Sequence, residues 1–352
     1  MFLNLMKILI PTAVAFFFGL LVTPFATHFF YKYRMWKKRT RTTSVSSTEF
    51  SKIHKAKEAS EVSTPCVGGI IVWVSVLLTT LLFYGLSFLF KDYSFFVDLN
   101  FLSRGQTFVP LAVFVLGALL GLLDDVLEIN GFSNITRDSK WYTKLKLGLI
   151  VFIGLIAGFW FFAKLGMESI DIPWGGVFYL GVWFVPFVIL IMLASFSTGV
   201  IDGIDGLSGG VLASIFAAYA VIAYTDNQID LAAFSAVISG ATLAFLWFNI
   251  PPARFYMGET GMMPLTIVLA TIAFLTDTVL LLPIIAFPLV MTSFSSSVQL
   301  IAKRFGRKVF KVAPLHHHFE ALGWPSYKVT MRYWVISVIF AVLGILLTII
   351  SR

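Results

Sequence analysis

Long apolar stretches separated by short polar segments run through the whole sequence. A helix of roughly 20 apolar residues crosses a bilayer core of about 30 Å, because it bonds every backbone polar group internally. Ten stretches approach that length, although a break at Leu282-Pro283 leaves nine or eleven as alternatives. The pattern therefore predicts ten membrane helices, at approximately 8–30, 68–90, 108–128, 145–164, 176–197, 209–224, 231–250, 264–282, 283–302 and 333–351.

Composition agrees with this pattern. Of the 352 residues, 58% are hydrophobic and only 12% are charged, whereas a soluble domain carries about a quarter charged residues. These values exclude a soluble globule and a disordered chain. The single cysteine, Cys66, excludes an intrachain disulfide framework. We expect one all-α polytopic membrane domain over residues 1–352, whose first stretch is too long for the apolar region of a cleaved signal peptide and so remains as a helix.

Basic residues are concentrated on one side of the predicted bundle. With ten spans, both termini lie on one side, and the other side receives the long loops 31–67 and 303–332. This second side holds 21 of the 26 Lys and Arg residues. The positive-inside rule makes it cytoplasmic and the termini external. The net charge of +8 is therefore expected to face the cytoplasm and anionic lipid, with no nucleic-acid partner.

Five carboxylates fall at the same cytoplasmic end. Asp124 and Asp125 close the third span, Asp202 and Asp205 lie in an Asp-Gly-Ile-Asp-Gly sequence, and Glu259 lies in Met-Gly-Glu-Thr-Gly. Carboxylates at this depth are costly unless they are paired or bind a cation, which makes them candidates for function. The structural alternatives are a solvated helix end for the first pair and a Gly-Asp turn for the second.

The chemistry of these carboxylates favours a hard cation. Mg²⁺ keeps some of its waters and binds phosphate oxygens, and glycines let the backbone approach closely. Asp202 and Asp205, three residues apart, share a helix face, whereas adjacent helical residues point about 100° apart. We therefore expect one of Asp124 and Asp125 to have a separate role.

A second polar cluster is the run Pro314-Leu315-His316-His317-His318-Phe319-Glu320, in the basic loop 303–332. Its imidazoles can donate hydrogen bonds to phosphate oxygens or orient the loop. A zinc site is disfavoured because three consecutive side chains diverge and no cysteine completes the set.

Three further side chains are candidates at the cytoplasmic face. Asn249 and Tyr256 precede Glu259, where an aromatic ring beside a carboxylate can stack on a base. For Tyr256 the alternative is an anchor at the membrane interface. Lys144, at the start of the fourth span, is either a partner for phosphate or a positive-inside anchor.

These motifs occur in the order found in a known family. The run from Pro314 to Glu320, followed by Gly323-Trp324 and Arg332-Tyr333-Trp334, resembles the PLHHHFE, GW and RFW signature of the MraY family. These are the phospho-N-acetylmuramoyl-pentapeptide transferases, within the polyprenyl-phosphate N-acetylhexosamine-1-phosphate transferase superfamily. The Asp motifs, Asn249 and the Glu259 motif extend the resemblance over roughly residues 60–335.

The resemblance implies a phosphoryl transfer at a membrane surface. Phospho-MurNAc-pentapeptide would pass from UDP-MurNAc-pentapeptide to undecaprenyl phosphate, releasing UMP and giving lipid I, the first membrane step of peptidoglycan synthesis. The family also implies a requirement for Mg²⁺, ten helices with external termini, a homodimer, and an active site on the cytoplasmic face of the bacterial inner membrane.

Roles for individual residues follow from the same resemblance. The implied catalytic residues are Asp124, Asp125, Glu259, His316, His317 and His318. The implied substrate-binding residues, which include a uracil-stacking aromatic, are Lys144, Asp202, Asp205, Asn249 and Tyr256. The implied metal ligands are Glu259, Asp125 and Asp202.

The sequence departs from the family's pattern at several positions. Glu259 replaces an Asp, which adds a methylene where Mg²⁺ requires near-octahedral geometry. Gly199 replaces the Asn of an NxxDG box, and Glu128 stands where a Lys usually follows the acidic pair. These changes concern metal affinity and donor preference, and they leave an inactive scaffold homologue as one alternative.

Two other functions are alternatives to the MraY reaction. A sister transferase would use UDP-GlcNAc or another UDP-N-acetylhexosamine, and His54 resembles a residue of that branch. A transporter would place ionisable groups near mid-membrane between broken helices. Only Asp277 is predicted to lie well within a span, which disfavours transport.

Overall fold

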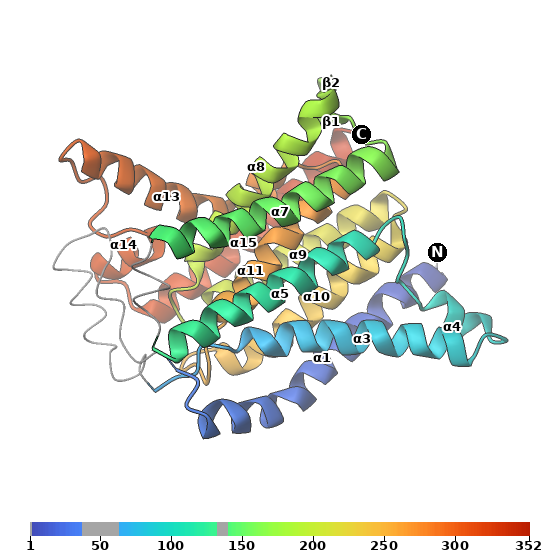
Figure 1. Cartoon of the computed structure of the whole chain (residues 1–352), viewed down its shortest axis with the longest axis horizontal. Coiled ribbons are helices and arrows are strands. Elements are labelled where there is room, and N and C mark those ends of the chain that lie inside the picture. Colours follow the sequence, from blue (N-terminus) through green and yellow to red (C-terminus); the bar gives the residue numbers. More distant parts are fainter. Residues whose placement is uncertain (1, 37–62, 132–139) are drawn as a thin grey trace.

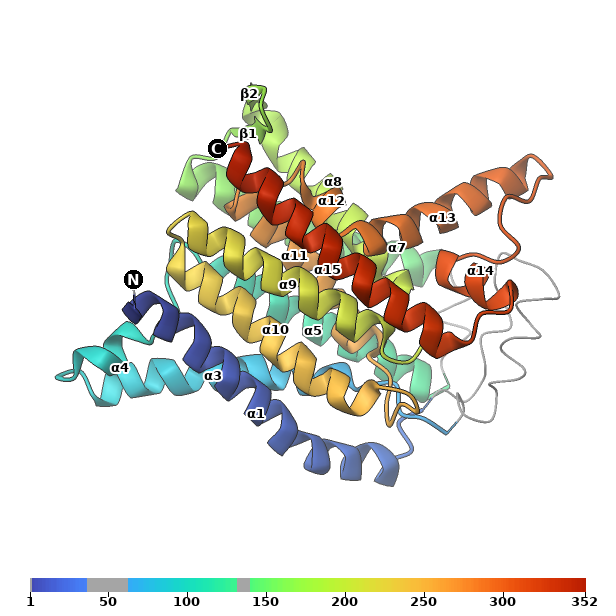
Figure 2. The same cartoon turned by 180° about the vertical axis from the view of Figure 1, so that it is seen from behind.

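The computed structural model describes residues 2–36, 63–131 and 140–352, and it shows a helical bundle with one small β-hairpin (Figures 1 and 2). The described part contains nine helices long and apolar enough to cross a membrane. The chain is therefore an all-α, multi-pass membrane protein. In chain order the elements are α1 (Phe2–Lys32), α3 (Gly69–Leu89), α4 (Ser94–Asp98), α5 (Phe108–Ile129), α7 (Lys140–Leu165), β1 (Ser169–Ile172), β2 (Gly176–Tyr179), η1 (Gly181–Trp183), α8 (Phe184–Ser197), η2 (Thr198–Ile201), α9 (Leu207–Thr225), α10 (Ile229–Asn249), α11 (Gly258–Leu275), α12 (Leu282–Ile285), α13 (Phe287–Arg304), α14 (Leu315–Ala321) and α15 (Ser326–Ile350).

Helices α10 and α11 form the centre of the bundle. In their most apolar windows, 83% and 89% of the residues are buried, against 17% in α1. A helix that is apolar on all sides is stable when other helices surround it. Helices α5 and α8 pack against α11, while α1 and α9 pack against α10. The two helices that flank the loop carrying Tyr256, α10 and α11, are therefore enclosed by other helices.

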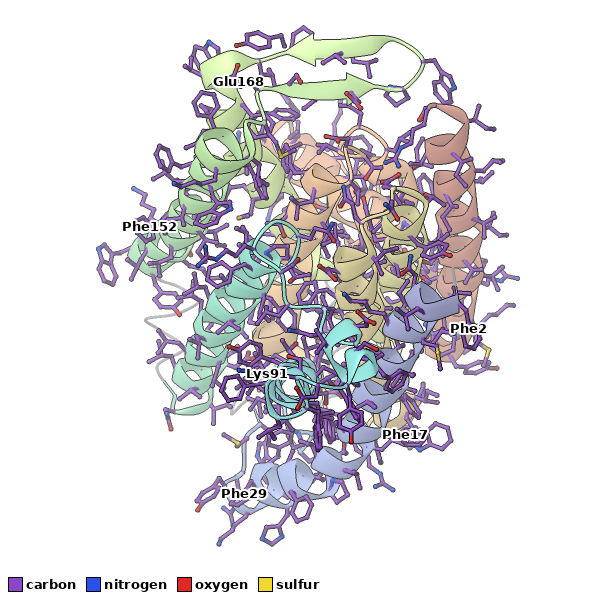
Figure 3. The ribbon with its side chains drawn as sticks, turned by 90° about the vertical axis from the view of Figure 1, so that its right-hand side faces the viewer. Phe2, Phe17, Phe29, Lys91, Phe152 and Glu168 are labelled. Atoms are coloured by element: carbon purple, nitrogen blue, oxygen red, sulfur yellow. The ribbon has the colours of Figure 1, made fainter. Side chains whose placement is uncertain are left out.

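The outer helices turn large apolar side chains away from the bundle. Figure 3 shows Phe2, Phe17 and Phe29 of α1 and Phe152 of α7 pointing outward, and each is more than half exposed. Aromatic side chains of this size would form costly exposed patches in water. Their environment is the hydrocarbon of a bilayer, in agreement with the apolar stretches of the sequence.

The ninth predicted span, 283–302, differs from the other nine. It is divided at Ala286 into the short α12 and the longer α13, and α13 is not among the apolar helices of the described part. Its buried side chains include Thr292, Ser295 and Gln299, while Phe294 and Ile301 are exposed. The far end of α13 stands apart from the other long helices in both views (Figures 1 and 2).

The start of the fifth predicted span, 176–197, is wrong. Residues 176–179 form β2, which pairs with β1 in an antiparallel hairpin with Ser169 opposite Tyr179 and Ile172 opposite Gly176. The membrane helix begins after this hairpin, within Gly181–Ile201. Glycines at a turn and alternating β-branched and aromatic residues favour a hairpin, whereas a hydropathy window registers only that these residues are apolar.

The termini and the predicted site lie at opposite ends of the bundle. Figure 1 shows the C-terminus beside the hairpin and the N-terminus near α4 at the same end of the bundle, while α14 lies at the other end. Asp277, which the sequence predicts to lie within the span 264–282, is instead in the turn after α11, at the end with the termini. The prediction that Asp277 lies within a membrane span is therefore wrong. This residue was the only ionisable group whose predicted position favoured a transporter.

Candidate active site

A lysine lies between two of the predicted acids at the end of the bundle away from the termini. Lys146 Nζ is 2.9 Å from Asp124 Oδ2 and 3.2 Å from Glu259 Oε1. These three side chains come from α7, the end of α5 and the first turn of α11, and each is mostly buried. The Tyr142 side chain also hydrogen-bonds Asp124. A cation shared by two carboxylates reduces their mutual repulsion where water is scarce.

Asp125 is fully buried next to Asp124 and faces the start of α11. Its Oδ2 accepts hydrogen bonds from the backbone N–H of Thr260 at 2.8 Å and from the Thr260 hydroxyl at 2.7 Å. The amino end of a helix favours a negative charge because its first N–H groups lack helical partners. Asp124 and Asp125 thus have different partners, as their adjacent positions on one helix predict.

Gly258 connects the carboxylates of α5 with those of the 202–206 loop. Its N–H donates to Asp202 Oδ2 at 3.1 Å, and a Cβ at this position would overlap the Asp125 carboxylate and the Cys66 carbonyl. Its φ of +67° lies in the left-handed region that glycine adopts readily. No larger residue fits here, so the glycine before Glu259 is what lets Asp125 and Asp202 approach the same backbone.

Asp205 and Asn249 fix the loop that carries Tyr256. Asp205 Oδ2 accepts the N–H of Ala253 at 3.1 Å. Asn249 Oδ1 accepts the N–H of Gly206 at 2.9 Å, while its amide donates to the Phe255 carbonyl at 2.8 Å. Both side chains therefore bond backbone within the described loops. Tyr256 is half-buried, which leaves part of its ring accessible for stacking.

His316 and His317 pack against the 202–206 loop. A Cβ on Gly203 would fall within 3.0 Å of the Nε2 atoms of both His316 and His317, so these imidazoles lie directly against the chain between Asp202 and Asp205. His317 Nδ1 is 2.7 Å from Glu320 Oε2. His318 points elsewhere: its Nδ1 accepts the N–H of Lys311 at 3.1 Å. Burial and the charge of Lys311 lower the pKa of His318.

Lys144 and His54 stand apart from this arrangement. Lys144 is exposed on α7 and forms no ion pair with the acids of the described residues, whereas Lys146, two residues further on, pairs with them. Residues two apart on a helix point to nearly opposite sides, so only one of the two lysines can face Asp124. His54, the residue that resembles the UDP-GlcNAc branch, lies outside the described residues.

Comparisons with known proteins bear on what this arrangement does. Residues 107–277 match the family model described as Glycosyl transferase family 4. A phospho-N-acetylmuramoyl-pentapeptide-transferase of Anoxybacillus flavithermus is 36% identical over 84% of this chain and 86% of its own length. The protein of that name from Chloroflexus aggregans is 31% identical over 99% of this chain and 91% of its own length. The chain belongs to the phospho-N-acetylmuramoyl-pentapeptide-transferase family. A further relative, from Chloroflexus aurantiacus, is 33% identical over 82% of this chain.

Two residues that contact the acids of the site, Lys146 and Thr260, are not identified by the sequence motifs. From sequence alone, Lys146 is one of the 21 basic residues of the predicted cytoplasmic side, and Thr260 is the residue after Glu259 in its motif. Helical phase relative to Lys144 is the available signal for Lys146, but it identifies the inward lysine only once the facing helix is known. Thr260 has the signal of a helix start beside glycine, which does not name its carboxylate partner.

The donor chemistry of the site suits a magnesium ion. Asp125, Asp202 and Glu259 supply carboxylate oxygens, the ligands that Mg²⁺ prefers, and Gly258 adjoins all three. The described residues contain no group of three His, Cys, Asp or Glu already placed to hold a metal. Mg²⁺ commonly uses one or two carboxylates together with water and substrate phosphates. These carboxylates therefore fit a metal ion that binds together with the substrate.

Proposed function

We propose that this chain transfers phospho-MurNAc-pentapeptide from UDP-MurNAc-pentapeptide to undecaprenyl phosphate, releasing UMP and forming lipid I. The observation that carries the proposal is the meeting of Asp124, Asp125, Asp202 and Glu259 from separate elements around Lys146 and Gly258. The name phospho-N-acetylmuramoyl-pentapeptide-transferase, carried by relatives similar over most of the chain, supports the chemistry of the donor.

In this proposal the protein mainly positions its substrates. In-line attack on phosphorus gains most from orientation and from charges that stabilise the phosphoryl oxygens. The Asp125 carboxylate, fixed by two bonds to Thr260, is oriented to accept a proton or hold a cation. The Lys146 ammonium offsets part of the negative charge of Asp124 and Glu259, which lowers the repulsion that a pyrophosphate donor meets on approaching these acids.

We also propose that Mg²⁺ is required, with Glu259, Asp125 and Asp202 as its protein ligands. When bound, Mg²⁺ would neutralise charge on the transferred phosphoryl group. Removing divalent cations with EDTA should abolish UMP release, and adding Mg²⁺ back should restore it. Full activity in EDTA would contradict the proposed requirement.

The remaining proposals concern orientation and assembly. We propose that the chain lies in the bacterial inner membrane with the site end of the bundle on the cytoplasmic side. Most Lys and Arg residues belong to the segments of that end. Labelling of an introduced cysteine at position 323 in intact and in inverted vesicles tests this, once Cys66 is replaced by Ser. We also propose a homodimer, which light scattering in detergent can test.

The central experiment follows UMP release by purified protein in nanodiscs with undecaprenyl phosphate and Mg²⁺. One reaction receives UDP-MurNAc-pentapeptide and a matched reaction receives UDP-GlcNAc. We expect release with the first donor only. Release with UDP-GlcNAc alone would show the sister transferase reaction, and no release with either donor would support the inactive scaffold.

A further inference from the structure

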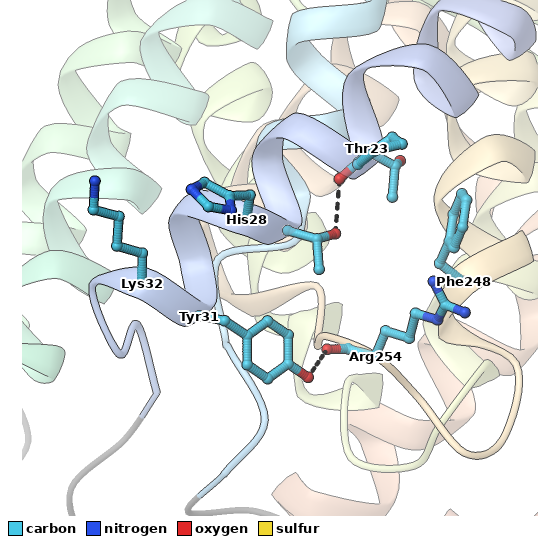
Figure 4. A pocket seen from close by; sticks show the side chains of 8 residues that line it. Thr23, His28, Tyr31, Lys32, Phe248 and Arg254 are labelled. Atoms are coloured by element: carbon cyan, nitrogen blue, oxygen red, sulfur yellow. Dashed lines mark hydrogen bonds between the residues drawn. The ribbon is translucent and has the colours of Figure 1, made fainter.

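Two surfaces of the described residues lie away from the candidate active site. One is a pocket beside the end of α1, where Figure 4 shows the Lys32 ammonium pointing away from the cavity and the Arg254 guanidinium at the opposite edge beside Phe248. Because these cations point apart, no single anion contacts both. The other surface is the hairpin of β1 and β2, where all four residues of β2 are exposed.

The strand register gives the hairpin two different faces. Directly opposed residues share a face, and successive residues along a strand alternate between faces. One face is entirely apolar and is formed by Ile170, Ile172, Gly176 and Phe178. The opposite face carries the polar side chains of the two strands and is formed by Ser169, Asp171, Val177 and Tyr179. The hairpin is therefore amphipathic.

The polar face belongs on the water side. The Tyr179 hydroxyl donates a hydrogen bond to the Glu168 carboxylate. The charge of Asp171 acts on Asp277 and Arg352, at the end of the bundle with the termini. Carboxylate and guanidinium groups are far more stable in water than in hydrocarbon. With these groups in water, the apolar face is directed toward the bilayer.

The apolar face continues the surface that the bundle turns toward lipid. Ile170 packs partly against the core, whereas Ile172 is 37% exposed and Phe178 is 53% exposed. Val182 and Trp183, which join the hairpin to α8, are 74% and 70% exposed. Trp and Tyr side chains are enriched where acyl chains meet headgroups. The hairpin and its connection to α8 thus have the composition of a membrane interface.

The base of the hairpin is fixed to the end of α7. The N–H groups of Leu180 and Gly181 donate to the Glu168 carbonyl at 2.8 and 2.9 Å, and the Met167 N–H donates to the Phe161 carbonyl at 3.1 Å. Figure 3 shows the two strands side by side at the rim of the bundle, where lipid surrounds a membrane protein. The hairpin therefore cannot turn its apolar face away from that boundary without breaking these bonds.

We infer that the hairpin lies in the membrane interface of the leaflet beside the termini, with Ile172 and Phe178 in contact with acyl chains and Asp171 facing water. The partner is a lipid surface. A second protein chain fits less well, because strands of four residues offer far less than the roughly 800 Å² per partner that a stable interface buries. Since the hairpin continues α7, its depth also sets the depth of that helix, which carries Lys146 near its other end.

The test compares adjacent positions on opposite faces of β2. The full-length Cys66→Ser protein in nanodiscs carries a nitrobenzoxadiazole label at Phe178→Cys or, as the matched control, at Val177→Cys. Phosphatidylcholine with a nitroxide on its acyl chain quenches from the lipid, and iodide quenches from water. We expect the Phe178→Cys label to lie about 5–10 Å into the boundary of headgroups and acyl chains, as amphipathic helices do. Iodide should quench it severalfold less than the Val177→Cys label.

A second pair of positions on β1 repeats the comparison. Ile172→Cys should behave like Phe178→Cys, and Asp171→Cys should behave like Val177→Cys, because each pair shares a face. This pair keeps the test decisive if Phe178→Cys does not fold, and thermal unfolding of each labelled variant shows which ones do.

Three results would overturn the inference. Equal quenching by iodide on both faces would place the hairpin in water. Protection of the Phe178→Cys label from both quenchers would show that protein, such as a second copy of the chain, covers the apolar face. Stronger lipid quenching at Val177→Cys than at Phe178→Cys would show that the hairpin faces the other way. These measurements do not depend on which donor the candidate active site uses.

Discussion

The two ends of the bundle both carry acidic residues, but they hold them differently. At the end with the termini, Asp230 pairs with Lys7 at 2.6 Å and Asp226 pairs with Arg352. Each of these pairs joins one carboxylate to one cation and fastens a terminal segment to the bundle. At the site end, one lysine serves two carboxylates, and the others accept N–H groups from loops.

Burial and pairing therefore do not by themselves distinguish function in this molecule. The Asp226 side chain is only 8% exposed and Asp125 is fully buried, and both have partners. What differs is convergence: carboxylates from different elements meet around one glycine at the site end, and among the described residues they outnumber the one cation paired with them, Lys146. An excess of negative charge at close range is costly for folding and is expected where a substrate or metal cation completes the site.

The largest expected effect separates the two buried aspartates. Asp125→Asn keeps an oxygen that can accept the Thr260 bonds but removes the charge, so turnover should fall by about a thousandfold or more. Asp226→Asn should leave turnover unchanged while lowering the melting temperature, because Arg352 loses its partner. UMP release and thermal unfolding of both variants measure this difference. Near-normal turnover of Asp125→Asn would show that the acidic pair is structural.

The next effect tests the lysine shared by two acids. Lys146→Met leaves Asp124 and Glu259 facing each other without a cation, and turnover should fall about a hundredfold. Lys144→Met is the matched control, since that side chain is exposed on the same helix, and its turnover should stay within about twofold of the wild type. Steady-state kinetics on both variants provide the measurement, and a larger loss in Lys144→Met would return the phosphate-binding role to the residue predicted from the sequence.

A smaller effect concerns the residue that departs from the family's pattern. If Glu259 is a metal ligand, Glu259→Asp should keep or raise turnover and lower the Mg²⁺ concentration needed for half-maximal activity. Asp is the residue that the family's pattern has at this position, and its carboxylate is one methylene closer to the backbone. A Mg²⁺ titration of UMP release measures this. A clear loss of turnover would mean that the surrounding geometry has adjusted to the longer side chain.

The smallest effect depends on pH. Burial and Lys311 lower the pKa of His318, so the folded state binds this proton less well than the unfolded state does. The resulting stability is present above the ordinary histidine pKa of about 6.5 and is lost as pH falls below it. His318→Asn retains an acceptor for the Lys311 N–H but cannot be protonated, so its melting temperature should fall less between pH 7 and pH 5.5. Identical pH dependence of both proteins would contradict this role.

The sequence predicted the helices well where one physical signal dominated. Apolar length located the nine membrane-capable helices of the described residues, and the resulting order of spans placed the acids at one end of the bundle, as the structure has them. It failed at residues 176–179 and 283–302, because average hydropathy does not report whether apolar residues belong to a strand or whether a helix buries hydroxyl groups. Such features depend on the partner elements and not on local composition.

The candidate site was predictable in its residue types but not in its pairings. The motifs brought Asp124, Asp125, Asp202, Asp205 and Glu259 to one surface. They did not indicate that Thr260 binds Asp125, or that Lys146 and not Lys144 faces the acids, because each contact joins helices far apart in the sequence. Their roles in catalysis stay predictions until the variants above are measured.

Helix α13 buries several polar side chains and exposes large apolar ones. Because Thr292, Ser295 and Gln299 of α13 are buried while Phe294 and Ile301 face outward, this outward face suits lipid better than water. We expect the thickness and fluidity of a surrounding membrane to act on α13, the helix that precedes the histidine segment in the chain. Reconstitution in lipids of different chain length is a way to tune that segment without altering a single amino acid.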